Sequence, residues 1–186
     1  MSDALIVEST RLPEVLLITP KVFADERGFL FASWHEQHFA AVGLPTRFAQ
    51  DLHSHSKRHT LRGLHFQIQQ SQGKLVRVTR GEGFDVAVDM RRSSPRFGQW
   101  VGVFLSSANS RMLWVPAGFA HGYLALSDDV DVLYKCTDFY APEFERAVRW
   151  DDPKLGIEWP LPAEVRPVMS AKDAAAPSFA AAETFA

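Results

Sequence analysis

The feature that most constrains the fold is a series of short segments after Lys74 in which apolar and polar residues alternate and turn residues intervene. Such alternation is the pattern of strands with one buried face. Repeated short strands joined by turns are typical of sandwiches and barrels. The segments are residues 75–80, 84–90, 98–105, 111–115, 122–126 and 130–137. We therefore predict an all-β protein, and we favour a jelly-roll β-barrel.

The first two of these segments predict a β-hairpin, because only Gly81, Glu82 and Gly83 separate them. Side chains of a strand point alternately to its two faces. In the second strand one face then carries only apolar residues, which are Phe84, Val86, Val88 and Met90.

Few helices are expected, and all of them are short and peripheral. Ser33 is a suitable N-cap for a helix from Trp34 to about Val42, and Gly43 is a natural stop. The alanine-rich tail, residues 174–186, predicts either a short surface helix or a partly disordered end. The length of 186 residues fits a single domain over residues 1–186.

The composition is that of an ordinary soluble protein, with 46% hydrophobic and 23% charged residues. A net charge of -2 argues against nucleic acid as the main partner. The N-terminus lacks the pattern of a secretory signal, and no stretch is long enough to span a membrane, so we expect a cytoplasmic protein. Cys136 is the only cysteine, which excludes an internal disulfide and agrees with a reducing compartment.

His65 is the first candidate for a catalytic base, because the pKa of a histidine is ordinarily near neutrality. It lies in a strand-like run in which alternation places His65 and Gln67 on one face and Arg62 on the other. Arg62 and His65 can share a pocket only if the strand bulges, which Gly63 permits.

The run that contains His53, His55 and His59 invites a metal interpretation, because histidines one residue apart on a strand can bind one ion. We disfavour it, since Lys57 and Arg58 follow where a metal-binding barrel usually supplies a glutamate. The segment is instead expected to be a polar loop over the barrel mouth. A metal-dependent cupin enzyme stays open as an alternative.

Basic and aromatic residues recur along the chain in a way that suits a nucleotide diphosphate. Guanidinium groups bind phosphate oxygens in a bidentate way, and an aromatic face can stack on a base. The residues concerned are Phe23, Arg27, Arg62, Lys74, His121, Tyr134 and Tyr140.

Several ordered motifs across nearly the whole chain resemble the dTDP-4-dehydrorhamnose 3,5-epimerase family of rhamnose biosynthesis, which has a cupin-like jelly-roll fold. The motifs are residues 23–29, 50–54, 61–67, 72–77, 83–89, 97–103, 116–122, 133–135, 140–142, 156–160 and 170–173. The resemblance implies an epimerase without a cofactor, acting on a dTDP-linked 4-keto-6-deoxy sugar. It also implies a homodimer in which an N-terminal strand reaches the partner.

The resemblance also implies residue roles. His65 matches the family base, Tyr134 the acid on the opposite face, and Asp173 the carboxylate paired with the base. Lys74 matches a lysine that stabilises the enolate oxygen, and Tyr140 an aromatic that stacks on thymine. The other matched ligand contacts, together with Phe23 of the first motif, are Arg27, Gln50, Arg62, His121, Glu145 and Lys172.

Two matched positions depart from the family pattern. Ala32 replaces a ligand-contacting glutamate, and Leu52 replaces an asparagine. Both changes remove a hydrogen-bonding group, so they bear on the ligand rather than on proton transfer. The alternatives are an epimerase that inverts only C3 or C5, an enzyme for another nucleotide-linked keto sugar, and a sugar-nucleotide binding module without catalysis.

Overall fold

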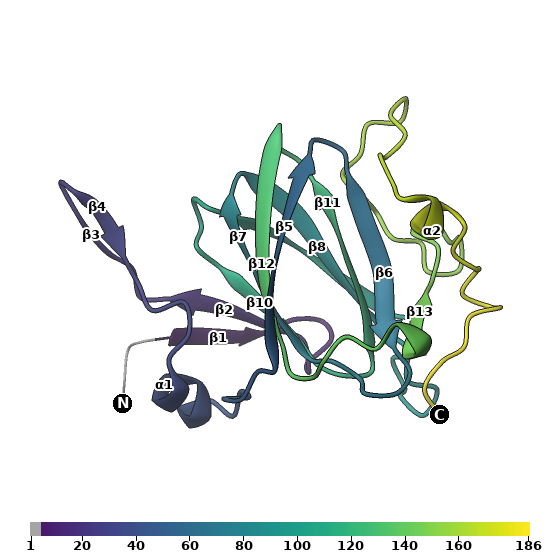
Figure 1. The fold of residues 1–186 in the computed structure, drawn as a ribbon, viewed down its shortest axis with the longest axis horizontal. Coiled ribbons are helices and arrows are strands. Elements are labelled where there is room, and N and C mark those ends of the chain that lie inside the picture. The colour runs from purple at the N-terminus through teal and green to yellow at the C-terminus, as the bar shows by residue number, and fades with distance from the viewer. Residues whose placement is uncertain (1–4) are drawn as a thin grey trace.

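The computed structural model describes residues 5–186, so part of the N-terminal stretch considered above lies outside it. Two antiparallel sheets face each other and form the barrel seen in Figure 1. The six-stranded sheet contains, in spatial order, β1 (Leu5–Ser9), β2 (Leu16–Pro20), β10 (Met112–Val115), β7 (Lys74–Arg80), β12 (Asp129–Cys136) and β5 (Gln50–Lys57). The five-stranded sheet contains β13 (Glu145–Ala147), β6 (Leu61–Gln67), β11 (Phe119–Ala125), β8 (Glu82–Asp89) and β9 (Trp100–Ser106). The predicted all-β, cupin-like jelly roll is confirmed.

The remaining elements are short. A separate two-stranded hairpin, β3 (Phe23–Asp25) with β4 (Gly28–Leu30), projects away from the barrel in Figure 1 and is called the arm below. The helices are α1 (Glu36–Ala41), the 3₁₀ turn η1 (Pro142–Phe144) and α2 (Ala171–Ala174). No helix in residues 5–186 is long and apolar enough to cross a membrane.

The apolar core consists of a layer between the two sheets and further layers on their outer faces. Between the sheets, side chains from both form one cluster, with Val76 and Val132 from one sheet and Ala87 from the other. On the outer face of the five-stranded sheet, Phe84, Val86, Val88 and Met90 pack under the C-terminal third of the chain. The predicted apolar face of that strand is therefore confirmed, because side-chain alternation follows directly from strand geometry.

The predicted hairpin between the segments after Lys74 is wrong. β7 and β8 belong to different sheets, and the chain crosses between them at Gly81, which has a φ of +72°. A β-carbon at Gly81 would lie 2.3 Å from the carbonyl oxygen of Asp129, so the crossing is tightly packed. Alternation defines the two faces of a strand but not its neighbours, and this is why the pattern was misleading.

The predicted first helix is present but shorter. It begins at Glu36, with His35 rather than Ser33 at the N-cap and no side-chain capping hydrogen bond. Residues 33–35 lie outside the helix, and Trp34 packs edge-on against Phe48, with ring centroids 6.5 Å apart. Gly43, with a φ of +74°, ends the segment as expected.

The tail after α2 is neither a surface helix nor loose. Ala182 is buried in the cluster on the outer face of the five-stranded sheet. The backbone N–H of Phe185 donates to the carbonyl of Met90 over 3.1 Å, and the N–H of Arg92 donates to Phe185 over 3.0 Å. An irregular segment is thus held by apolar packing and backbone hydrogen bonds, which short-range sequence patterns do not reveal.

Candidate active site

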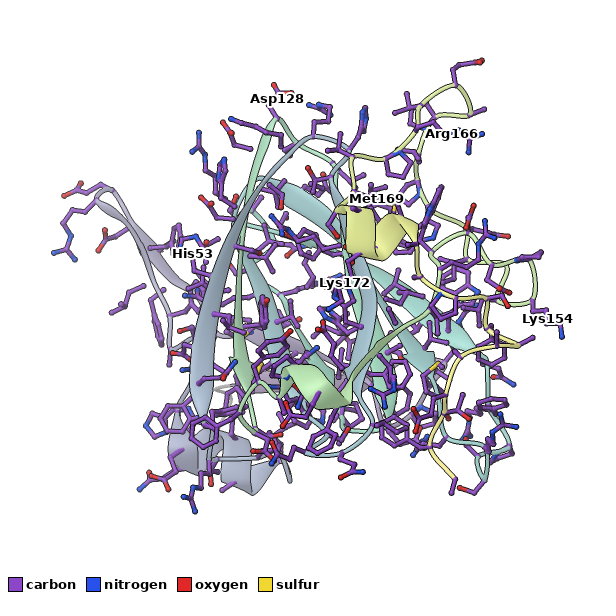
Figure 2. The ribbon with its side chains drawn as sticks, turned by 45° about the vertical axis from the view of Figure 1, so that its right-hand side comes forward. His53, Asp128, Lys154, Arg166, Met169 and Lys172 are labelled. Carbon is purple, nitrogen blue, oxygen red and sulfur yellow. The ribbon has the colours of Figure 1, made fainter. Side chains whose placement is uncertain are left out.

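A cavity of about 590 Å³ opens between the two sheets. Strands from both sheets line it, and the segment around α2 covers one side, where Figure 2 labels Met169 and Lys172. The lining includes the four residues expected to carry the chemistry and three of those expected to bind the ligand: His65, Lys74, Tyr134, Asp173, Arg62, His121 and Lys172.

His65 on β6 is paired with the buried carboxylate of Asp173, which lies on α2. The Nε2 atom of His65 lies 2.7 Å from Oδ1 of Asp173. Ser170 caps α2 by accepting a hydrogen bond from the Asp173 amide, and this orients the carboxylate. Burial alone would raise the pKa of Asp173, but the hydrogen bond and charge of His65 bring it below its usual value. The carboxylate is therefore ionised beside the imidazole.

A bulge in β6 brings Arg62 and His65 to the same cavity. In the pairing of β6 with β11, His65 is opposite His121 and Arg62 is opposite Tyr123. Between these two pairs β6 advances by three residues while β11 advances by two, so β6 contains one extra residue. Gly63 lies within this irregularity with a φ of +120°. The expectation that Gly63 allows a bulge is confirmed.

Gly63→Ala should destabilise the protein and disturb the site. A β-carbon there would lie 2.6 Å from Cα of Gly122 and 2.8 Å from the carbonyl oxygen of His121, and both are backbone atoms. Forcing such overlap costs roughly 1–3 kcal/mol or more. Chemical denaturation measures this loss of stability. Gly28→Ala is the matched control, since Gly28 has a similar φ of +129° but open space around it. An equal loss in both variants would show that backbone strain, and not the contact with Gly122, is responsible.

Tyr134 and Lys74 face the same cavity from the six-stranded sheet, opposite His65. Tyr134 on β12 packs against the interior cluster that includes Val130 and Val132, as alternation predicted. Burial raises the pKa of Tyr134, so its phenol stays neutral and able to donate a proton. Desolvation lowers the pKa of Lys74, although nearby acidic groups partly oppose this.

A second histidine–carboxylate pair lies beside the first. Nε2 of His121 is 2.9 Å from Oδ1 of Asp85, and both side chains are buried. His121 is directly opposite His65 in the β6–β11 register. The sequence analysis left Asp85 unassigned, although a carboxylate between the apolar residues Phe84 and Val86 was an available signal. Asp89, which was considered with it, pairs with Arg91 instead.

Three of the expected ligand residues form the rim rather than the wall of the cavity. The amide of Tyr140 donates to Gln50 over 3.1 Å, and the Tyr140 hydroxyl donates to Glu145 over 2.6 Å. Lys172, which does line the cavity, pairs with the same Glu145 oxygen. The carboxylate of Glu145 raises the pKa of Tyr140 to about 12. Gln67, predicted on the face of His65, is buried and binds the backbone of the loop that carries Tyr140.

Comparison with known proteins agrees with this geometry. The family described as dTDP-4-dehydrorhamnose 3,5-epimerase matches residues 9–181. A dTDP-4-dehydrorhamnose 3,5-epimerase from Pseudomonas aeruginosa is 55% identical over 182 residues, which cover 96% of this chain and 99% of that protein. The crystal structure of dTDP-6-deoxy-D-glucose-3,5-epimerase from Legionella pneumophila in complex with dTDP-4-keto-L-rhamnose superposes with a TM-score of 0.91 at 49% identity, covering 95% of this chain and 94% of that chain.

The chain belongs to the dTDP-4-dehydrorhamnose 3,5-epimerase family. The resemblance found in the sequence is thereby confirmed, and with it the epimerase class of the enzyme. A 3'-monoepimerase from Streptomyces bikiniensis in complex with dTDP-quinovose is also similar, with a TM-score of 0.87 at 33% identity over 93% of this chain and 87% of that chain.

Two residues expected to contact the ligand of this epimerase do not line the cavity of their own chain. Phe23 and Arg27 lie on the arm, where Phe23 is 61% exposed and Arg27 pairs with Asp25 at 2.6 Å. The arm exposes further apolar surface at Phe29 and Leu30.

The two departures from the family pattern also lie outside the lining of the main cavity. Ala32 is exposed just beyond the arm. Leu52 on β5 is directly opposite Tyr134 in the β5–β12 register. Leu52 therefore neighbours the tyrosine expected to act as the acid.

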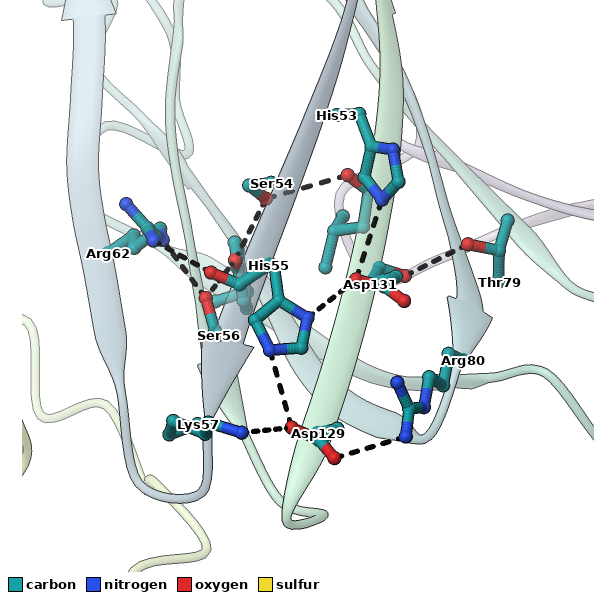
Figure 3. Close-up of polar contacts among 12 residues, drawn as sticks. His53, Ser54, His55, Ser56, Lys57, Arg62, Thr79, Arg80, Asp129 and Asp131 are labelled. Carbon is teal, nitrogen blue, oxygen red and sulfur yellow. Dashed lines mark hydrogen bonds and ion pairs between the residues drawn. The ribbon is translucent and has the colours of Figure 1, made fainter.

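His53 and His55 lie in a strand of this epimerase and not in a polar loop, which corrects the expectation above, whereas His59 lies in the turn that follows the strand. β5 pairs with β12 along its whole length, and His53 and His55 point away from Ser54 and Ser56 (Figure 3). Nδ1 of His55 is 2.8 Å from Oδ1 of Asp131, and Nε2 of His53 is 3.4 Å from the same oxygen. Within residues 5–186 no group of three or more His, Cys, Asp or Glu side chains is arranged to hold a metal ion.

Proposed function

We propose that this epimerase inverts C3 and C5 of a dTDP-4-keto-6-deoxyhexose, using the cavity residues named above for the proton transfers. One observation carries the proposal: His65 of one sheet, with its partner Asp173 from α2, and the half-buried, neutral Tyr134 of the other sheet line the same cavity. A base and an acid on opposite walls suit removal of a proton from one face of a carbon and its return to the other.

We propose particular atoms for the proton steps. Nε2 of His65 is engaged with Asp173, so Nδ1 is left to accept the proton of a carbon next to the C4 ketone. The electron pair of the broken C–H bond moves into an enolate whose oxygen the Lys74 cation stabilises. The ionised Asp173 stabilises the imidazolium that forms. Tyr134 then donates its proton to the opposite face of the carbon, which completes the inversion.

The remaining residues are proposed to hold the nucleotide. Arg62, His121 and Lys172 line the cavity and offer positively charged or donating groups to the diphosphate and sugar. Tyr140, 53% exposed at the rim, offers a ring for stacking on thymine, and Gln50 and Glu145 support it through hydrogen bonds.

Proton NMR of the enzyme with dTDP-4-keto-6-deoxyglucose in deuterated water tests this function. Deuterium is expected at both C3 and C5. The same purified sample should be assayed for bound metal, because activity that depends on a metal would favour the metal-dependent cupin alternative. Binding of the nucleotide sugar without any exchange would favour a binding module.

An epimerase of a single centre is the second candidate. It is supported by the similarity to a 3'-monoepimerase and by the apolar Leu52 opposite Tyr134. Deuterium at only one of C3 and C5 would establish it in place of the double epimerase.

We also propose a homodimer in which the arm of each subunit supplies Phe23 and Arg27 to the cavity of its partner. The exposed apolar residues of the arm and its projection away from the barrel in Figure 1 support this arrangement. A cytoplasmic location is proposed as well, since a chain with one cysteine forms no internal disulfide, which agrees with a reducing compartment.

Mixed dimers should show this exchange of arms. Arg27→Ala and His65→Asn subunits are each expected to form weakly active or inactive homodimers. In a mixed dimer, one cavity has an intact His65 and receives an intact Arg27, so co-expression should restore activity. Size-exclusion chromatography with light scattering should give the mass of a dimer. Activity no higher than the sum of the two homodimers would show that each arm serves its own subunit.

A further inference from the structure

A buried chain of hydroxyl groups connects the two sheets next to the cavity. The hydroxyl of Tyr123 on β11 lies 2.8 Å from Oγ of Ser56 and 3.0 Å from Oγ of Ser54, both on β5 of the other sheet. Tyr123 is 4% exposed and Ser56 is 3% exposed. Figure 3 shows Ser54 and Ser56 on the side of β5 that faces Arg62. Buried hydroxyls of this kind need defined partners, so the chain is a fixed part of the structure.

Arg62 is the charged end of this chain, and it lines the cavity together with Ser56 and Tyr123. Its Nε donates to Oγ of Ser56 over 3.0 Å, and its Nη2 donates to the carbonyl of His55 over 3.1 Å. Among residues 5–186, no carboxylate forms an ion pair with Arg62. Neutral acceptors thus hold the guanidinium, and its positive charge is left for an anionic ligand.

One assignment of protons uses every contact in the chain. Arg62 donates to Ser56, Ser56 donates to Tyr123, and Tyr123 donates to Ser54. Ser54 in turn donates to the carbonyl of Val132, 3.4 Å away. Each hydroxyl then donates one hydrogen bond and accepts one, and consecutive bonds strengthen one another. The Tyr123 hydroxyl is the central member, because it contacts both Ser56 and Ser54.

We propose that Tyr123 is a positioning residue, which acts through Ser56 to hold the Arg62 guanidinium in place for the diphosphate of the nucleotide. This rests on the proposed function, because it takes a nucleoside diphosphate as the ligand of the cavity. Tyr123 is directly opposite Arg62 in the β6–β11 register, so its backbone is tied to the same bulge that turns Arg62 inward. Side chain and backbone together therefore restrict the orientation of Arg62.

Binding of dTDP, measured by calorimetry for four forms of the protein, tests the proposal. The forms are the unchanged protein, Tyr123→Phe, Arg62→Ala and the double variant. Tyr123→Phe removes one oxygen atom and is expected to weaken binding roughly fivefold to tenfold, since it loosens a charge-assisted contact. In the double variant the loss should equal that of Arg62→Ala alone, because Tyr123 acts through Arg62.

Two further measurements separate positioning from a general effect on folding. Ser56→Ala breaks the same connection by another route and should weaken dTDP binding to a similar extent. For Tyr123→Phe, the KM of the nucleotide sugar should rise while kcat changes little, which a merely structural role would not produce.

Each outcome has a definite meaning. Unchanged dTDP affinity in Tyr123→Phe, or a full additional loss when it is combined with Arg62→Ala, would overturn the positioning role and leave the proposed function intact. Failure of the unchanged protein to bind dTDP would instead overturn the proposed function, and this inference with it.

Discussion

Replacing His65 by asparagine is expected to reduce solvent exchange at C3 and C5 of the substrate by about 10²–10⁴-fold, the range for loss of a positioned base. Asparagine is smaller than histidine and keeps a polar amide near the ionised Asp173, whose Oδ1 lies 2.7 Å from Nε2 of the imidazole in the unchanged protein. The variant should therefore fold and bind dTDP, since only the proton acceptor is lost. Proton NMR in deuterated water measures the exchange at each carbon.

His38→Asn is the matched control, because it makes the same substitution on α1, outside the cavity. It should retain the activity of the unchanged protein. Normal exchange in His65→Asn would remove His65 as the base, and His121, which lies opposite it with its own carboxylate, would become the next candidate.

The Tyr134→Phe variant is expected to separate exchange from inversion. With His65 and Asp173 intact, the base can still remove a proton and return deuterium from the solvent to the same face. Without the phenol of Tyr134, the opposite wall lacks the group proposed to complete the inversion. We expect deuterium at C3 and C5 with formation of the inverted sugar reduced roughly 10²-fold or more.

The same NMR spectra distinguish the two results, because the inverted sugar has its own anomeric and methyl proton signals, which remain after exchange, while loss of the C3 and C5 proton signals reports exchange. His65→Asn is the reference that should lack both. Inversion at the normal rate in Tyr134→Phe would mean that water or another cavity residue donates the proton, and the two-wall mechanism would be wrong.

The strands and their faces were predictable because they depend on local geometry. Phe84, Val86 and Val88 share a buried face since successive side chains of a strand alternate. The bulge at Gly63 was also predictable, because glycine tolerates the backbone conformation it requires. The pairing of β7 with β8 was mispredicted, since alternation contains no information on which strands become neighbours.

The barrel class, the family and the motif residues His65, Tyr134, Lys74 and Asp173 were predictable from the sequence. Which of these residues contact each other depends on the tertiary structure. Asp173 is 108 positions from His65 and reaches it because the C-terminal segment packs along the five-stranded sheet. The pairs His121–Asp85 and Tyr123–Ser56 likewise join distant strands. Local patterns predict the face of its own strand to which a side chain points, but long-range packing determines which residues that side chain contacts.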